Sequence, residues 1–228
     1  PLLIPGERFT ERYVRNCPKI VVPDNPMPYT ICEYNLGNLE HIGIADRVEF
    51  VGSLLDITPV EGKDEYIFAA ISGPAGTRAR LMKMVIPILS EMKMQSIVSL
   101  GETGKRVTAK VGNCTIYSWL TPGERRDFMA NSRVVIFSGG HNTRFEVIKY
   151  MKPSICIPTQ PEQMANARKL QELKCATIAT NKKQLMHAIQ EMRDKWEFYK
   201  ENVRMLNRYS GKFRGLDWTL RIIESIRG

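Results

Sequence analysis

From residue 64 onward the sequence alternates short apolar runs with longer amphipathic stretches, and this alternation restricts the fold more than any other feature. The apolar runs, each of strand length, cover residues 66–71, 95–100, 114–117, 133–137, 154–158 and 176–179. Helices are predicted over residues 77–92, 122–130, 142–149 and 162–173, then through Ile189 and over residues 199–209 and 218–226. Strands that alternate with helices predict an α/β fold, a Rossmann-like doubly wound parallel sheet with right-handed crossovers.

The first 53 residues show a different pattern. Their strand candidates, residues 19–22 and 48–51, are separated by a proline-rich stretch. Two strands without a clear amphipathic helix cannot close a core, so we interpret residues 1–53 as the end of an incomplete amino-terminal domain. Residues 54–63 are expected to form a linker, and residues 64–228 a second domain with carboxy-terminal helices. The chain is therefore expected to be a fragment, or a natural half, of a larger assembly.

Composition and residue counts exclude several classes of protein. With 43% hydrophobic and 25% charged residues among 228, the chain can bury a core. No run reaches the roughly 18 apolar residues of a membrane helix and no signal-peptide layout appears, so a cytoplasmic protein is expected. The cysteines lack a C-x-x-C pair and are expected to be reduced core thiols. The histidines His41, His141 and His187 lie far apart, so no metal site is expected.

The net charge of +9 favours phosphorylated ligands, polyanions or an anionic membrane surface as partners. The charge is spread along the chain rather than clustered. Basic pairs such as Arg125-Arg126 and Lys182-Lys183 are interleaved with apolar positions at helical spacing, which predicts solvated helix faces. No aromatic-basic RNA signature or helix-turn-helix pattern is present, so nucleic acid is not the expected partner.

The polar and glycine-rich segments all follow predicted strands. In a parallel sheet, ligands bind beyond the carboxyl ends of the strands. The segments at that edge are Ser72 to Arg78, Ser118-Trp119, Ser138 to Glu146 and Thr159 to Asn166. Each has a plain structural explanation alone: a tight turn, a core tryptophan or first-turn helix residues. Their clustering at one edge predicts a phosphate cradle, an aromatic platform and carboxylates that accept hydrogen bonds from hydroxyls.

The turn Ser138-Gly139-Gly140 joins a buried strand to a helix. Its glycines have no Cβ that would keep a ligand from the backbone, and the free N–H groups of the next helix point toward that ligand. A diphosphate is the expected guest.

The residues at this edge resemble a known family. The stretch Ser138 to Thr143 with Glu146, then Lys152-Pro153, Ile157-Pro158, Glu162-Gln163 and Asn166-Ala167, is similar to the donor-binding half of GT-B glycosyltransferases of the MurG-like and UDP-glycosyltransferase group. Glu146 and Glu162 lie 162 − 146 = 16 residues apart, the spacing expected of that group's signature. A weaker likeness covers residues 17–53, where Phe50-Val51-Gly52 leads into the linker.

The resemblance implies a role for each matching residue. The diphosphate would be bound by Gly139, Gly140, His141, Asn142 and Thr143 with Ser138, and by Ser72, Gly73 and Arg78 of the first glycine-rich turn. Glu146 would bind the ribose hydroxyls, and Glu162, Gln163 and Asn166 the sugar. Trp119 stands one residue from the family's base-stacking tryptophan, so main-chain groups from Tyr117 to Leu120 are the alternative for holding the base.

The resemblance also implies the chemistry. It predicts transfer of a sugar from a nucleotide-sugar, UDP-linked, to a lipid or glycan acceptor, without metal or other cofactor, in cell-envelope biosynthesis at the cytoplasmic membrane face. The base that deprotonates the acceptor belongs to the amino-terminal domain in this family, so none is assigned here. Two alternatives stay open: a UDP-N-acetylglucosamine 2-epimerase of the same fold, and a non-catalytic nucleotide- or nucleic-acid-binding module.

Overall fold

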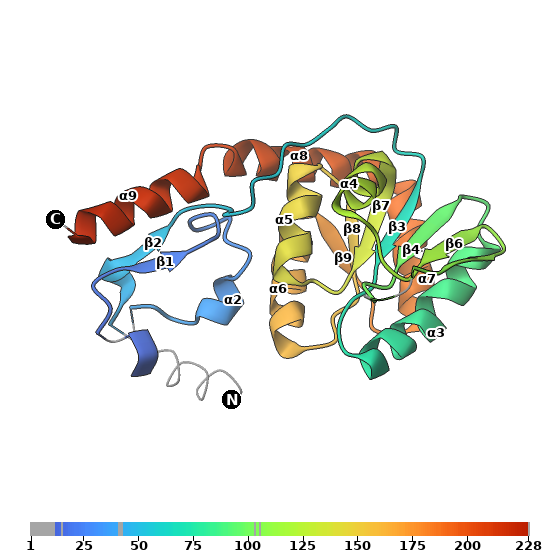
Figure 1. The fold of residues 1–228 in the computed structure, drawn as a ribbon, viewed down its shortest axis with the longest axis horizontal. Coiled ribbons are helices and arrows are strands. Elements are labelled where there is room, and N and C mark those ends of the chain that lie inside the picture. The colour runs from blue at the N-terminus through green and yellow to red at the C-terminus, as the bar shows by residue number, and fades with distance from the viewer. Residues whose placement is uncertain (1–11, 15, 41–42, 103, 105, 228) are drawn as a thin grey trace. The chain divides into compact units, whose positions relative to one another are not determined.

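The structure, a computed structural model, describes residues 12–14, 16–40, 43–102, 104 and 106–227 (Figure 1). Two compact units divide the described residues. One contains the residues up to Asp56 together with those from Leu206 onward, and the other contains Ile57–Met205. His41, one of the three histidines, lies outside the described residues.

The larger unit is built on a seven-stranded sheet of order β5-β6-β4-β3-β7-β8-β9. The strands are β3 (Tyr66–Ala70), β4 (Ser96–Ser99), β5 (Thr108–Val111), β6 (Cys114–Tyr117), β7 (Ser132–Phe137), β8 (Ser154–Cys156) and β9 (Ala176–Ile178). All neighbouring strands pair in parallel except β5 and β6. The predicted doubly wound, mostly parallel sheet is confirmed. The strand order reverses between β3 and β7, which makes that junction the topological switch point.

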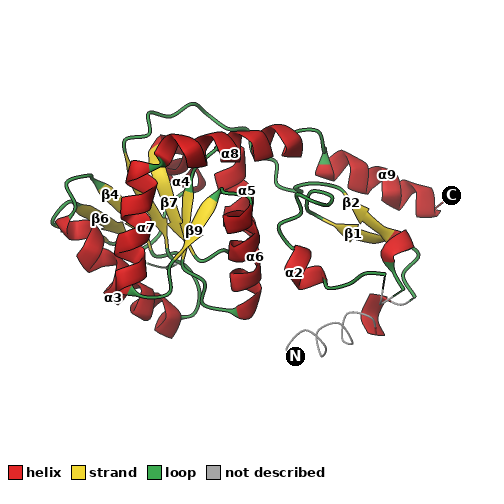
Figure 2. Ribbon diagram, turned by 180° about the vertical axis from the view of Figure 1, so that it is seen from behind, coloured by secondary structure: helices red, strands yellow, loops and turns green. Residues whose placement is uncertain are grey.

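Helices cover both faces of this sheet. They are α3 (Ala75–Glu91), α4 (Pro122–Asn131), α5 (His141–Lys149), α6 (Pro161–Glu172), α7 (Lys182–Asp194) and α8 (Trp196–Ser210). Figures 1 and 2 show α5 and α6 on one side of the strands and α3 and α7 on the other. Alternate strand residues serve the two faces: Ile67 and Ala69 join the core beneath α3 and α7, whereas the Phe68 ring meets Phe128 of α4.

The strand β5 was not predicted from the sequence. All of its residues are exposed, so it lacks the apolar run that marks the other strands. It is held as an antiparallel edge strand by a tight connection at Gly112, which has φ of +54°. A Cβ at Gly112 would lie 2.2 Å from the carbonyl oxygen of Ser90, so only glycine fits there.

The smaller unit contains a two-stranded parallel sheet of β1 (Ile20–Val22) and β2 (Val48–Phe50). It also contains α2 (Glu33–Leu36), a 3-10 turn at Ala45–Arg47, the end of α8 and α9 (Gly215–Arg227). Buried Asp24 organises the loop after β1, because its carboxylate accepts hydrogen bonds from the backbone N–H groups of Ile31 and Cys32, both at 2.9 Å. Asn25 Nδ2 donates to Ser210 Oγ at 2.8 Å and so joins this loop to the end of α8.

The grouping of the last helix differs from the prediction. We expected residues 64–228 to form one domain, but the residues from Leu206 onward cluster with those before Asp56. Close contacts account for this: a Cβ at Gly52 would lie 2.5 Å from Cβ of Phe213, and one at Gly215 would lie 2.2 Å from the carbonyl oxygen of Ser53. The carboxy-terminal segment is therefore packed against the segment that follows β2.

Candidate functional site

The turn between β7 and α5 exposes its backbone at one of its two glycines. Gly139 has φ of +86°, and a Cβ there would lie 2.7 Å from the carbonyl oxygen of Gln163, so packing against α6 requires this glycine. Gly140 has an ordinary φ of −66°, and a Cβ there would meet only Ser138 Oγ, at 3.5 Å. The absence of a side chain at Gly140 therefore leaves the start of α5 open to a ligand.

Helix starts at this edge differ in whether a side chain caps them. Thr121 and Glu124 form a capping box on α4, and Asn181 caps α7. No side-chain cap is found at the starts of α3, α5 and α6. Because α3 and α5 follow β3 and β7, two uncapped helix starts flank the switch point of the sheet. Uncapped first-turn N–H groups and the helix dipole favour an anion at this position.

Glu146 of α5 is held by an arginine of the neighbouring helix. Arg125 Nε donates to Glu146 Oε1 at 2.8 Å, and Arg125 Nη2 donates to Glu146 Oε2. The same Nη2 lies 3.1 Å from Thr143 Oγ1. The arginine side chain is 31% exposed and the glutamate 19% exposed, so the pair is partly desolvated. We predicted Arg125 to lie on a solvated helix face; this is wrong for Arg125, whereas Arg126 is exposed.

The start of α5 carries a second basic group. Arg144 is fully buried, and its Nη2 lies 2.9 Å from His141 Nδ1. The same Nη2 also lies 3.4 Å from His141 Nε2, so the guanidinium, which can only donate, is directed at the imidazole ring. The His141 ring also meets the Phe145 ring edge-on, with centroids 5.0 Å apart. These contacts fix the imidazole at the mouth of the turn, while Asn142 beside it is exposed.

The predicted sugar-binding residues divide into two groups. Asn166 is buried, and its Nδ2 donates to the carbonyl oxygen of Gly139 at 3.1 Å and to Glu162 Oε1 at 2.7 Å. It therefore braces the turn from the side of α6. Gln163 Oε1 accepts from the backbone N–H and the hydroxyl of Thr159, both at 2.9 Å, so its carbonyl oxygen is used within the turn that precedes α6. Glu162 is exposed.

The predicted base-binding segment follows β6. The Tyr117 ring packs against Phe128, with centroids 5.5 Å apart, and the Tyr117 carbonyl accepts from Leu100 N–H. Ser118 uses its N–H and carbonyl in pairs with Val107 and Glu102. Trp119 is half-buried and donates its indole N–H to the carbonyl of Gly104 at 3.1 Å. Among the described residues, the backbone N–H and C=O groups of Trp119 and Leu120 make no backbone–backbone hydrogen bond outside helices and strands.

In the described part of the chain, the glycine-rich turn at Ser72-Gly73 is hydrogen-bonded to Arg78 and not to the turn at Ser138–Gly140. Ser72 and Gly73 are exposed after β3, and Gly73 has φ of +111°. Arg78 Nη1 donates to the carbonyl oxygen of Gly73 at 2.8 Å, and its Nη2 lies 3.5 Å from Glu102. Within the described residues, no hydrogen bond or ion pair joins Arg78 to the turn Ser138–Gly140. Arg78 therefore stabilises its own turn in this structure.

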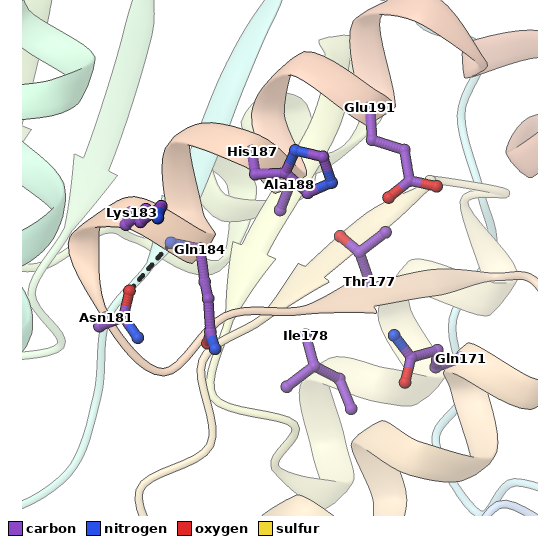
Figure 3. A pocket seen from close by; sticks show the side chains of 9 residues that line it. All are labelled: Gln171, Thr177, Ile178, Asn181, Lys183, Gln184, His187, Ala188 and Glu191. Atoms are coloured by element: carbon purple, nitrogen blue, oxygen red, sulfur yellow. Dashed lines mark hydrogen bonds between the residues drawn. The ribbon is translucent and has the colours of Figure 1, made fainter.

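Three cavities of the larger unit lie at different distances from these residues. A hollow of about 290 Å³ adjoins the site, because Thr159 and Pro158 line it together with residues of α3. A cavity of about 520 Å³ lies at the outer edge strand β9, between Gln171 of α6 and His187 and Glu191 of α7 (Figure 3). A third, of about 770 Å³, lies at the opposite, amino end of the strands. No predicted site residue lines the second or the third cavity.

The described part of the chain contains neither a metal-binding cluster nor a membrane-spanning helix. There, no group of three His, Cys, Asp or Glu side chains could hold a metal ion. None of the described helices combines the length and the apolar character needed to cross a membrane. His187 is exposed on α7.

A mostly parallel sheet with helices on both faces and a topological switch point defines the class of doubly wound α/β domains, in which ligands bind beyond the carboxyl ends of the strands. Residues 104–212 match the glycosyltransferase family 28 C-terminal domain. The chain is 23% identical over 237 residues to a protein of Methanosarcina mazei named "uncharacterized glycosyltransferase", covering 97% of this chain and 60% of that protein. A protein of the same name from Methanosarcina acetivorans is 22% identical, with coverage of 96% and 59%. The chain thus spans about 60% of the length of these relatives.

Solved structures give the same fold. The calicheamicin glycosyltransferase CalG4 superposes with a TM-score of 0.69 at 13% identity, over 98% of this chain and 59% of its own. The kitacinnamycin glycotransferase gives 0.69 at 14% identity, over 96% and 61%. The Streptomyces glycosyltransferase SsfS6, complexed with thymidine diphosphate, gives 0.56 at 18% identity, over 75% and 45%. The comparisons confirm the predicted resemblance to GT-B glycosyltransferases of the MurG-like and UDP-glycosyltransferase group.

Proposed function

We propose that this chain binds a nucleotide-sugar and supplies the donor-binding half of a metal-independent glycosyltransferase. The observation that carries the proposal is the open start of α5, where Gly140 leaves the helix uncapped and Glu146 stands one and a half turns further along the same helix. The first feature suits a diphosphate, and the second suits the hydroxyls of a ribose. The family match over residues 104–212 supports this reading over an epimerase.

The leaving diphosphate would be stabilised by backbone N–H groups and fixed basic side chains. A charge that develops on the leaving group is stabilised most by donors that are already oriented. The starts of α3 and α5 supply such donors, and the His141 ring, held by Arg144, lies at the start of α5. Gln163 Nε2 and Glu162 would bind the sugar, and Asn166 would act by holding the turn.

The donor proposal is tested by ligand-induced stabilisation. UDP and a UDP-sugar at millimolar concentration should raise the melting temperature, because a ligand that binds only the folded state stabilises it. Thymidine diphosphate, which SsfS6 binds, is the comparison ligand, and inorganic phosphate is the control for a simple anion effect. If the folded protein shows no shift with any nucleotide, the proposal fails. Steep salt dependence of oligonucleotide binding, without a nucleotide response, would instead favour a nucleic-acid-binding module.

We further propose that the acceptor site and the base come from a partner domain, in the same polypeptide or as a separate chain. Apolar side chains on α9 support this, because Leu216, Trp218, Leu220, Ile223 and Ile226 are between 42% and 55% exposed. The longer relatives support it as well. Determining the complete reading frame of the gene tests this proposal; hydrogen exchange of α9 in the longest product should then be slower than in this chain.

We propose a lipid or a glycan as the acceptor; the family resemblance supports this, and the net charge of +9 suits an anionic lipid surface. Cytoplasmic, peripheral attachment to an anionic membrane surface belongs to the same proposal. Co-sedimentation with vesicles of anionic lipid, compared with neutral vesicles, tests the attachment. Equal binding to both would contradict it.

A further inference from the structure

We infer that Arg125 is a positioning residue that sets the orientation of the Glu146 carboxylate for a ribose diol. The inference rests on the proposed nucleotide site and adds a residue to it. Arg125 belongs to α4, and Glu146 and Thr143 belong to α5, so the contact crosses between two helices. One guanidinium contacts all three oxygen atoms: both carboxylate oxygens of Glu146 and the hydroxyl of Thr143.

Arg125 is itself held in place. The first turn of α4 is fixed by the capping box, in which Glu124 accepts from Thr121 N–H at 2.9 Å and Thr121 Oγ1 accepts from Glu124 N–H at 3.2 Å. The Arg125 guanidinium also lies 6.0 Å from the centroid of the ring of Phe68, a residue of β3. A planar fork on a fixed helix start defines both the position and the plane of the carboxylate that it binds.

The fork leaves acceptor capacity on Glu146 for a ligand. An ionised carboxylate offers about four lone-pair sites, and a two-pronged contact with arginine uses two of them, one on each oxygen. The remaining pair suits two adjacent hydroxyl donors, which is the geometry of a 2′,3′-diol. We therefore assign the site to ribonucleoside diphosphates in preference to 2′-deoxyribonucleoside diphosphates, and we assign the preference to the Arg125–Glu146 pair.

The test compares UDP with 2′-deoxy-UDP in calorimetric titrations of the whole chain. The wild type should bind UDP more tightly. Arg125→Met should weaken UDP binding about tenfold, the effect of one lost charged hydrogen bond, and should weaken 2′-deoxy-UDP binding less, because that nucleotide keeps only the 3′ hydroxyl as a donor to Glu146. Glu146→Gln should have the same effect, and the double variant should lose no more than either single variant. Arg126→Met is the matched control, because it removes an equal charge from the exposed neighbouring position.

The outcomes separate a positioning role from a structural one. Equal weakening of both nucleotides by Arg125→Met would indicate a general structural effect and overturn the inference, as would unchanged discrimination. Arg125→Lys serves if the methionine variant does not fold: lysine keeps the charge but lacks the fork, so the ratio of UDP to 2′-deoxy-UDP affinity must fall. A folded wild type that binds neither nucleotide would defeat the proposed function itself, and with it this inference.

Discussion

Gly139 and Gly140 are adjacent in sequence, yet the fold requires glycine only at Gly139, whereas at Gly140 it is the proposed ligand that needs the space. Gly139→Ala should destabilise the fold by about 2–3 kcal/mol, because a Cβ at φ of +86° is strained and would press on the Gln163 carbonyl. Gly140→Ala should cost about 1 kcal/mol or less, the cost of alanine at an N-cap position. The same Cβ would stand at the open start of α5.

The two variants should therefore rank in opposite order for stability and for UDP affinity. Urea unfolding should rank Gly139→Ala as the less stable variant. Titration with UDP should show the larger loss of affinity for Gly140→Ala, although this variant loses less stability. A Gly140→Ala protein that binds UDP as the wild type does would show that no ligand approaches the backbone at this turn.

The cysteines give a residue-scale test of the packing. Cys17 is half-buried, whereas Cys32, Cys114, Cys156 and Cys175 are buried. Burial raises the pKa of the Cys114, Cys156 and Cys175 thiols, which lowers their reactivity further because the thiolate is the nucleophile. At pH near 8, a chromogenic disulfide reagent should modify Cys17 first and the four buried thiols only on addition of denaturant. Rapid modification of all five, or protection of Cys17, would contradict this packing.

At the scale of elements, the sequence predicted the strands that carry apolar runs and missed the strand that does not. The buried strands β3, β4, β6, β7, β8 and β9 fall within or next to the predicted ranges, because burial on both faces selects continuous apolar residues. The exposed strand β5 forms through backbone pairing with β6, and such pairing does not require an apolar run in the sequence.

The site shows the same division. The turn at Ser138 and the helix that follows could be read from glycines placed after an apolar run. The ion pair of Arg125 with Glu146 could not, because it depends on how α4 and α5 are rotated against each other. Helical periodicity places a basic residue on a polar face, but it does not say which residue of another helix that face will meet.

A buried charge cluster joins three elements of the larger unit. Asp64, just before β3, accepts from Lys152 Nζ at 2.7 Å and from Lys200 Nζ of α8 at 3.2 Å. The two lysine side chains are 4% and 8% exposed, and burial lowers the pKa of Lys152. Asp64→Asn should lower the free energy of unfolding by about 2–3 kcal/mol, because it leaves two buried ammonium groups without their counter-charge.

Asparagine suits this test because Asp64 has φ of +52°, a conformation that asparagine also tolerates. The exposed Asp56→Asn is the control for loss of one negative charge. Adding Lys200→Met to Asp64→Asn should recover part of the loss in urea unfolding, since one of the two orphaned charges is then removed. Asp64→Asn within about 0.5 kcal/mol of the wild type would rule out a stabilising role for the cluster.

At the scale of the whole chain, the division into two units could not be read from helix periodicity. The helix α9 is amphipathic, but its sequence pattern does not indicate which unit its apolar side chains contact. The structure assigns it to the smaller unit through Gly215 and Phe213, where close backbone approach decides the packing. The boundary falls inside α8, between Met205 and Leu206, so one continuous helix serves both units.

Buried thiols and phenols predict how stability depends on alkaline pH. Burial raises the pKa of Cys175 and of Tyr66 to about 12 each, and raises the pKa of Cys156 and Tyr199 as well. A group whose pKa is raised on folding contributes stability that is fully present below its unfolded pKa and is lost as the pH rises through the folded pKa. For a thiol with an ordinary value of 9.0, stability should therefore fall from pH 9.0 toward about 12. Lys152, whose pKa is lowered, acts in the opposite direction.

The contribution of the buried thiols can be isolated with Cys156→Ala/Cys175→Ala. A thiol that stays protonated only in the folded state lowers the free energy of unfolding by about 1.4 kcal/mol for each pH unit above its unfolded pKa. At about 1.5 pH units above that pKa, each fully buried thiol should therefore lower the stability of the wild type by about 2 kcal/mol. The double variant loses packing at every pH, so the difference between pH near 8 and pH near 10.5, not the absolute stability, is the measurement. Urea unfolding should show a smaller alkaline loss in the variant than in the wild type. Parallel losses in both proteins would mean that these thiols do not stay protonated in the folded state, which would contradict the burial of β8 and of the turn before β9.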